Sequence, residues 1–458
     1  MKLRPALTAL ASLAVALSTV ASRPAQAQQP PPVANLTLAQ VVALAKERAP
    51  AVHAAFARIA SAEASVERAR AAWLPSLYLQ GAGNAFASNG EVYSSGVASN
   101  TSKESYLIGS GALNLQWSLY DFGHTSKAID AAAEGVNAAR LSASATEQIA
   151  MAEAAVAFFT LLADDALIAS AQAVRADREH VLEVTHHLVA GGYRPPVDET
   201  RAKIGLDVAD LELSFVTAGR ANDSVNLANA LQLDPSTTFH LTAAAPIAVN
   251  ENAVGNGAVA LRARRDVAAA NARVDAARLS LDSAKRSYLP VLAGTASGQL
   301  LYSEGSQTTG SGNQTNTTPY NGPTEQIQGT LTLTIPVFDA LIHANVRAAE
   351  ASLGEARANL EQVSLTARSE ALQAAQQARN ARTILEQSQR LATGTAANLS
   401  AVEDRYASGM ESPLALADAQ REDILARDSV IKARLAYDVA AVRLLAGLSR
   451  ADDLLKAR

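Results

Sequence analysis

The seven histidines are the side chains of this chain best suited to acid–base or metal chemistry. His180 and His187 share one face of a predicted helix, but no glutamate-containing metal-binding motif accompanies them. We therefore expect the histidines to be solvent-facing or packing residues rather than catalytic groups or metal ligands.

Other catalytic patterns are also absent from the sequence. It contains no Gly-x-Ser-x-Gly nucleophile motif, and no cysteine for a nucleophile, a thiolate metal site or an N-terminal lipid anchor. The glycines Gly305, Gly310 and Gly312 lie in a Ser/Asn/Thr-rich segment that lacks the lysine of a phosphate-binding loop. We predict a protein that is not an enzyme, with no resident metal and no cofactor.

The composition favours long, closely packed helices. Of 458 residues, 100 are alanine and only 4% are aromatic. Alanine has the highest helix propensity but buries little area, so it suits thin helical layers better than thick globular cores. The formal net charge of −5 argues against a nucleic-acid partner, which usually needs a basic surface.

Residues 1–27 resemble a secretory signal peptide. Lys2 and Arg4 form a basic start, residues 7–17 are apolar, and Ala-Gln-Ala at 25–27 is a small-x-small cleavage site. The apolar stretch is shorter than the roughly 20 residues that a membrane-spanning helix needs. We expect an exported protein with no transmembrane helix.

The rest of the chain contains one pattern twice. Three pairs of motifs recur in the same order, 215 to 218 residues apart: Trp-Leu-Pro (73–75) and Tyr-Leu-Pro (288–290), Tyr-Asp-Phe (120–122) and Phe-Asp-Ala (338–340), and Gly192 with Pro196 and Gly409 with Pro413. A duplication predicts a first repeat at 28–245, a linker at 246–257 and a second repeat at 258–458.

Each repeat is predicted to begin with a helix, at about 37–73 and 261–288, followed by a strand hairpin. Apolar and polar residues alternate near both ends of residues 75–119 and 290–338, which predicts strands of about 10–14 residues. The polar segments 88–104 and 303–325 are expected to be loops. Pro336 predicts a bulge or bend at the end of the last strand.

Two very long helices follow the hairpins. Residues 125–190 and 342–407 contain no proline, and at 1.5 Å per residue each would form a rod of about 100 Å. Apolar residues recur every seven positions in these segments and in the return segments that end near 233 and 448. This spacing predicts two antiparallel coiled-coil hairpins.

Four strands with one apolar face cannot close a barrel within one chain, and a bilayer does not tolerate unpaired strand edges. Three chains would supply twelve strands around a water-filled lumen. The alternative is a soluble antiparallel sheet with one wet face.

The duplicated order of Leu-Pro, strand hairpin, Tyr-Asp-Phe-Gly, long helix, glycine-containing turn and return helix resembles the TolC-like outer membrane efflux protein family. The resemblance implies a mainly α-helical homotrimer. It has a 12-stranded outer-membrane β-barrel, four strands per chain, continued by an α-helical tunnel across the periplasm. The linker would belong to a belt around the tunnel.

The resemblance also implies a function and partners. The chain would conduct substrates for a tripartite efflux or type I secretion system, with a periplasmic adaptor (membrane fusion) protein and an inner-membrane transporter of RND, ABC or MFS type. A periplasmic coiled-coil adaptor or scaffold without a barrel is the alternative. The cargo cannot be inferred from these residues.

The resemblance further suggests residues that close the periplasmic end. Asp198 and Tyr406 match an inter-helix latch, but the position of the latch arginine is Glu411 here, so that Arg194 or Arg405 would have to replace it. Alternatively, these are ordinary solvated side chains at helix ends.

Of two aperture acids in the family, one position is Ala415 and the other retains Asp418. Three-fold symmetry would multiply Asp418 into a ring, as in cation-selective pores. As for the latch, the alternative is a solvated carboxylate near a helix end.

Two further sets of residues are candidates for contacts with partners and lipid. The turn residues Gly191, Gly192, Pro196, Gly409 and Pro413 would shape the reversals, with glycines allowing positive φ, and would leave a groove for an adaptor. Where the strands leave the membrane, an aromatic belt or core packing would involve Trp117, Tyr120, Phe122 and Phe338.

Overall fold

The protein was analysed as a computed structural model that describes residues 36–94, 97–242, 247, 249, 264–311, 314–408 and 410–456. The expected signal peptide, Gly409 and all of the linker except residues 247 and 249 lie outside the described residues.

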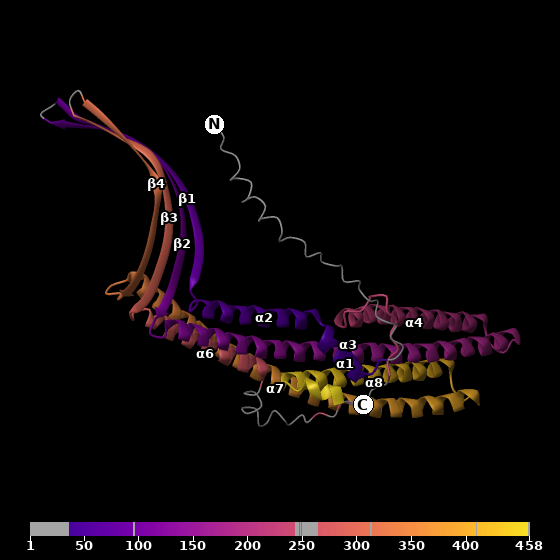
Figure 1. Ribbon diagram of the computed structural model, residues 1–458. Coiled ribbons are helices and arrows are strands. Elements are labelled where there is room, and N and C mark those ends of the chain that lie inside the picture. The colour runs from indigo at the N-terminus through magenta and orange to yellow at the C-terminus, as the bar shows by residue number, and fades with distance from the viewer. Residues whose placement is uncertain are drawn as a thin grey trace.

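The prediction of a mainly helical chain with a small sheet is confirmed (Figure 1). The helices are α1 (Leu38–Arg48), α2 (Pro50–Ala71), α3 (His124–Ala190), α4 (Pro196–Ala230), α6 (Arg265–Arg286), α7 (Ala340–Ala407), α8 (Pro413–Gly447) and the short 3₁₀ helix η2 (Ala451–Lys456). The strands are β1 (Ser76–Ser94), β2 (Val97–Tyr120), β3 (Val291–Ser311) and β4 (Gln314–Thr334).

The strands form one antiparallel sheet in the order β1-β2-β3-β4. Figure 1 shows the sheet rising from one end of the helices and curving along its length. Each inner strand has two neighbours, whereas β1 pairs only with β2 and β4 only with β3 among the described strands. The sheet of a single chain therefore has two open edges.

The strands are longer than the sequence predicted. They contain 19, 24, 21 and 21 residues, and most of the polar residues expected in loops continue the ladders. Backbone pairing does not need apolar side chains, and hydroxyl groups add contacts across the strands. Thr308 and Thr317 are bonded at 2.8 Å, and Ser105 and Ser306 at 3.4 Å. The expectation of long loops is therefore wrong.

Two prolines mark boundaries between elements. The first predicted helix is two helices, because Pro50 has no N–H and its ring disfavours helical backbone at Ala49, whose ψ is 129°. The second proline, Pro336, lies just beyond the end of β4 at Thr334, and the chain bends at the next residue, Val337, before α7 begins. The bend expected near Pro336 is therefore present, although it lies after the strand. The register shift at this end of the sheet lies in β2 instead, between Ser118 and Tyr120.

The helices form a layer that begins below the sheet and ends at two helical hairpins (Figure 1). The long helices α3 and α7 run through the whole layer. Near the sheet they pack with α2 and α6, and further away α4 packs on α3 and α8 packs on both α3 and α7. The α4 helix therefore lies at one edge of the hairpin layer and α7 at the other.

The main core lies midway along this layer, where α1, α3, α4, α8 and η2 meet. Met151, Phe158 and Leu161 of α3 are fully buried there. By length and composition alone, one stretch of α3 is apolar enough to cross a membrane. In this fold, the apolar middle of α3 supplies the core of the helical layer.

Candidate functional site

The first hairpin reverses at a glycine pair in which only one residue needs a glycine conformation. Gly192 has a φ of 72°, whereas Gly191 has a φ of −79°, which any residue can adopt. The N–H of Tyr193 donates to the carbonyl of Leu188 at 2.9 Å, closing the end of α3. The expectation of positive φ is thus right for Gly192 and wrong for Gly191.

Beyond this turn, Pro196 begins α4, and in the second hairpin Pro413 begins α8. Proline suits the first turn of a helix because the N–H groups of that turn have no hydrogen-bond partner within the helix, so the absence of one costs little. Ser412 caps α8, since its hydroxyl accepts the N–H of Ala415 at 3.1 Å. The two prolines thus fix where the return helices start.

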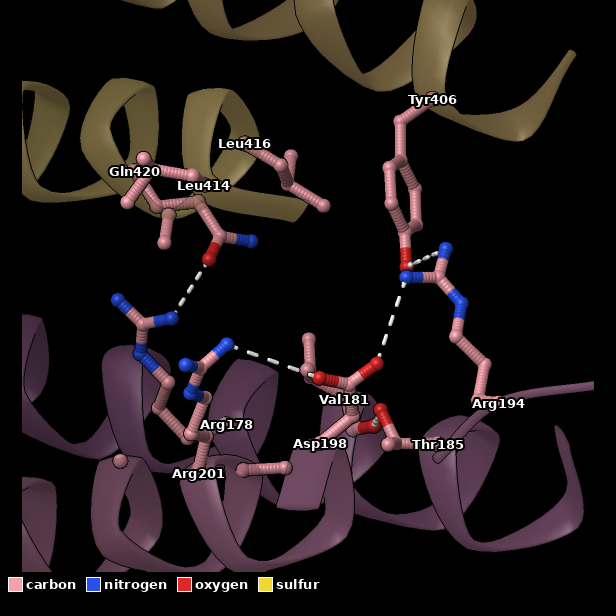
Figure 2. A pocket seen from close by; sticks show the side chains of 13 residues that line it. Arg178, Val181, Thr185, Arg194, Asp198, Arg201, Tyr406, Leu414, Leu416 and Gln420 are labelled. Carbon is pink, nitrogen blue, oxygen red and sulfur yellow. Dashed lines mark hydrogen bonds and ion pairs between the residues drawn. The ribbon is translucent and has the colours of Figure 1, made fainter. Parts of the chain in front are cut away.

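Three of the predicted tip residues meet between the two hairpins (Figure 2). Arg194 donates from Nη2 to the hydroxyl of Tyr406 at 3.1 Å, and its guanidinium carbon lies 5.4 Å from the centre of the tyrosine ring. A second guanidinium nitrogen, Nη1, lies 3.7 Å from Asp198 Oδ2. Arg194 therefore links a carboxylate of α4 to a tyrosine of α7.

The remaining predicted tip residues stand apart from this cluster. Arg405 and Asp418 are exposed. Glu411 accepts the N–H of its neighbour Ser412 at 3.3 Å. Of the two arginines considered as replacements for the latch arginine, Arg194 is the one that contacts Tyr406.

Two contacts between the hairpins were missed by sequence reasoning. Arg178 of α3 donates to Oε1 of Gln420 in α8 at 2.6 Å, and Ser170 donates to Asp428 at 3.2 Å. None of these residues belongs to a recognisable motif. Their pairing depends on how α3 and α8 are placed relative to each other, because the bonded residues are 242 and 258 positions apart in sequence.

A cavity of about 340 Å³ lies at this junction. Its polar lining includes Arg178, Arg194, Arg201 and Asp198, and its apolar lining includes Leu414. Burial lowers the pKa of the Arg178 guanidinium, and the charge of neighbouring Asp177 partly offsets this.

The four aromatic belt candidates lie where the sheet meets the helices. Trp117 donates its indole N–H to the carbonyl of Trp73 at 2.8 Å, and the Tyr120 and Phe122 rings meet edge to face at 4.7 Å. Phe338 is 90% exposed in the single chain. Trp117, Tyr120 and Phe122 thus make contacts within the chain, whereas the Phe338 side chain is largely exposed.

An aspartate in each repeated motif caps the helix that follows. Asp121 accepts the N–H groups of Gly123 at 3.1 Å and Thr125 at 2.7 Å. Asp339 accepts the N–H of Leu341 at 2.7 Å. The sequence motif was noticed because it repeats, but its capping role was not predicted.

Midway along α3, two carboxyl groups from different helices lie together. Burial and, next, the charge and hydrogen bond of Asp223 in α4 raise the pKa of Asp164 to about 6. Its neighbour Asp165 is bonded instead to Arg220 of α4. Adjacent aspartates of one helix are thus in opposite electrostatic environments.

The histidines take part in local contacts. His186 Nδ1 lies 2.8 Å from Glu199 Oε1, and His124 Nδ1 lies 2.9 Å from the carbonyl oxygen of Ser283. Across the part of the chain that the structure describes, no three His, Asp or Glu side chains are grouped as a metal site would require.

Comparisons with known proteins agree with this architecture. The sequence profile of a family described as "Outer membrane efflux protein" matches residues 41–232 and 258–449. A relative from Bordetella pertussis, Protein CyaE, is 25% identical over 425 residues, covering 91% of this chain and 85% of the relative.

Solved structures share the fold over most of their length. A membrane protein from Pseudomonas aeruginosa has a TM-score of 0.74 at 22% identity, covering 90% of this chain and 93% of its own. The Campylobacter jejuni CmeC outer membrane channel has a TM-score of 0.70 at 17% identity, with 90% and 86% covered. The outer membrane protein VceC of Vibrio cholerae has a TM-score of 0.70 at 18% identity, with 90% and 96% covered.

Proposed function

Because the chain belongs to the outer membrane efflux protein family, we propose that three copies assemble into one passive channel. Twelve strands close a β-barrel in the outer membrane, and the helices continue it as a tunnel through the periplasm. Substrates enter at the helical tips and leave through the barrel. No catalytic step is part of this proposal.

The observation that carries this proposal is the open sheet at the end of the long helices. Strands of 19 to 24 residues exceed the roughly 9–11 residues that a tilted strand needs to cross a bilayer. In lipid, the free backbone groups of β1 and β4 would each lack a hydrogen-bond partner. Pairing β4 of one copy with β1 of the next satisfies both edges.

The helical edges support the same assembly. The α4 helix packs mainly on α3, and it carries a stripe of exposed apolar residues that we call the α4 stripe: Val197, Ile204, Val208, Leu211 and Phe215. At the opposite edge, α7 exposes Leu365, Leu372, Ile384 and Leu391. Two apolar edges of one chain suit a ring in which α4 packs against α7 of the next copy.

Assembly and conductance test the proposal together. The full-length protein in detergent is expected to have the mass of three chains, to change gel mobility on heating, and to form conducting pores in planar bilayers. A soluble monomer without conductance would contradict the proposal and favour the periplasmic scaffold.

We further propose that the tips are the gate and the docking end. An adaptor protein and an inner-membrane transporter, for efflux or type I secretion, would engage the turns that contain Gly191, Gly192 and Pro196 and those that contain Gly409 and Pro413. The aromatic residues Trp117, Tyr120, Phe122 and Phe338 would contact the outer membrane lipid.

At the gate itself, Arg194 performs the linking role for which the family uses an arginine at the position of Glu411. It joins Asp198 and Tyr406 and so holds the two hairpins of one chain together. Arg405 stays at the surface of the same tip, and Asp418 contributes one carboxylate per chain to a ring around the aperture.

The gate proposal predicts the effect of removing one hydroxyl group. Tyr406→Phe deletes the acceptor of the Arg194 hydrogen bond while keeping the ring, at a cost of about 1.5–3 kcal/mol for a bond to a charged group. We expect a several-fold higher open probability in bilayer recordings. Tyr193→Phe changes a tyrosine at the same tip that is 82% exposed, and should leave gating unchanged. Equal behaviour of both variants would remove Tyr406 from the gate.

A further inference from the structure

The tip cavity has two chemically different sides. The guanidinium groups of Arg178 and Arg201 extend from α3 and α4 into it, and Leu414 and Leu416 of α8 face them (Figure 2). Its volume of about 340 Å³ is within the range of small-molecule sites. One side of the cavity is thus cationic and the other apolar.

The positive charge on the cationic side is not balanced. Among the described residues, three arginines but only one carboxylate, Asp198, line the cavity. That carboxylate lies 3.7 Å from both Arg194 and Arg201, at the outer limit of an ion pair. It is shared between two cations and fully neutralises neither.

Arg178 has a neutral partner instead of an acid. It donates to the amide oxygen of Gln420 at 2.6 Å, while Asp177, the preceding residue, acts on it through its charge alone. A half-buried guanidinium is costly to keep without a hydrogen-bonded carboxylate. A carboxylate that entered the cavity would supply this missing partner.

We propose that the tip cavity binds a carboxylate carried on a short apolar stem. Arg178 and Arg201 hold the carboxylate group by charge-assisted hydrogen bonds, and Leu414 and Leu416 pack against the stem. Because the arginines lie on the first hairpin and the leucines on the second, the ligand bridges the two hairpins. The proposal concerns ligand binding by a single chain and does not depend on the channel assignment.

Titration calorimetry with hexanoate as the probe tests this site in the full-length protein held in an amphipathic polymer. We expect saturable binding of one hexanoate per chain. Acetate lacks the apolar stem, hexanol lacks the charge, and hexylammonium carries the opposite charge, so each should bind at least tenfold more weakly. Equal binding of hexanol, or no saturable binding of hexanoate, would overturn the proposal.

Substitutions locate the binding in this cavity. Arg178→Gln should weaken hexanoate binding at least tenfold, and so should Arg201→Gln, whose side chain is 77% exposed and therefore tolerant of change. Arg175→Gln is the matched control. This arginine, one turn before Arg178, is already bound by Asp210 at 2.6 Å and Glu179 at 3.0 Å. Unchanged binding in Arg201→Gln would contradict the assignment even if Arg178→Gln failed to fold.

A competition experiment separates the two sources of such a carboxylate. A short peptide with one glutamate between leucines would displace hexanoate if the natural ligand is a side chain of a protein partner. Its glutamine counterpart should not displace it. Displacement by neither peptide, with hexanoate binding intact, supports a free organic anion as the ligand. Equal displacement by both peptides would contradict recognition of a carboxylate.

Discussion

At the scale of single residues, the repeated aspartate motif, Tyr-Asp-Phe at 120–122 and Phe-Asp-Ala at 338–340, lies at the start of a long helix. Asp121 is only 8% exposed and accepts the N–H of Gly123, the residue before α3, and the N–H of Thr125, which the first turn of α3 would otherwise leave without a partner. Gly123 supports this by taking a left-handed φ of 89°. Asp339 caps α7 with a single bond and is exposed. In both repeats an aspartate thus caps the long helix, but the aspartate is buried in the first repeat and exposed in the second.

This difference predicts unequal effects of removing the caps. Asp121→Ala should destabilise the protein by about 1–2 kcal/mol, and Asp339→Ala by less, in thermal unfolding followed by circular dichroism. Although burial raises the pKa of Asp121, hydrogen bonds from Thr125 lower it overall. The stabilisation by Asp121 is therefore present near neutral pH and lost as the pH falls below about 4. Equal effects of the two variants would contradict this account.

Asp164 predicts the opposite pH dependence. Burial and Asp223 raise its pKa from 3.8 to about 6, so the folded protein binds this proton more tightly than the unfolded chain. Its contribution is fully present below about pH 4 and is lost as the pH rises through about 6. Asp164→Asn should remove this dependence and stabilise the protein at pH 7 by about 1–2 kcal/mol.

The neighbouring aspartate is the control for Asp164. Asp165→Asn breaks the ion pair with Arg220 and should lower stability at pH 7, by about 1 kcal/mol or less. Melting temperatures of both variants between pH 5 and 8 distinguish the two environments. If Asp165→Asn stabilised the protein and Asp164→Asn destabilised it, Asp165 rather than Asp164 would be the aspartate whose charge is unfavourable at pH 7.

At the scale of elements, the sequence predicted the long helices well and the sheet less well. The absence of proline over 125–190 and 342–407, together with heptad spacing in part of each segment, gives α3 and α7 a strong local signal. Their observed bounds lie within two residues of the predicted ones. The outer parts of β2 and β3 are rich in Ser, Thr and Asn, which occur in loops and on wet strand faces alike. Only pairing with distant residues identifies such segments as strands.

Close contact between β2 and β3 predicts a position-specific effect of glycine substitution. A Cβ on Gly305 would lie 2.5 Å from Ser105 O and 2.6 Å from Tyr106 Cβ. Gly305→Ala should therefore cost about 1–3 kcal/mol and reduce the folded yield. Gly298 of the same strand has nothing within 4 Å of its added Cβ, so Gly298→Ala should be tolerated. A normal yield of folded Gly305→Ala would contradict the tight contact.

At the scale of the whole molecule, alanine permits the thin layer in which the tip site is built. Ala371, Ala375 and Ala378 of α7 are buried against Ala440 of α8, which lets these helices approach closely. The alanine-rich composition therefore predicted this close helix packing. The family resemblance predicted that Asp198 and Tyr406 would form part of an inter-helix latch at the tips. The resemblance left Arg194 and Arg405 as equal candidates to replace the latch arginine. Only the placement of the two hairpins distinguishes them, because Arg194 contacts a residue 212 positions away.

Assembly of three chains yields the last prediction, which concerns the α4 stripe. Phe215 is 65% exposed in the single chain, and burying its ring against a second copy should contribute about 1.5–3 kcal/mol per interface. Phe215→Asp instead places a charge in that interface, and a closed ring contains the defect three times. We expect the mass in detergent to fall from three chains to one, with unchanged helix content. Ser214→Asp adds the same charge to the preceding position of α4, which is also exposed, and should remain trimeric. If Phe215→Asp also stayed trimeric, α4 would face the lumen or solvent, and the ring would have to close through other surfaces.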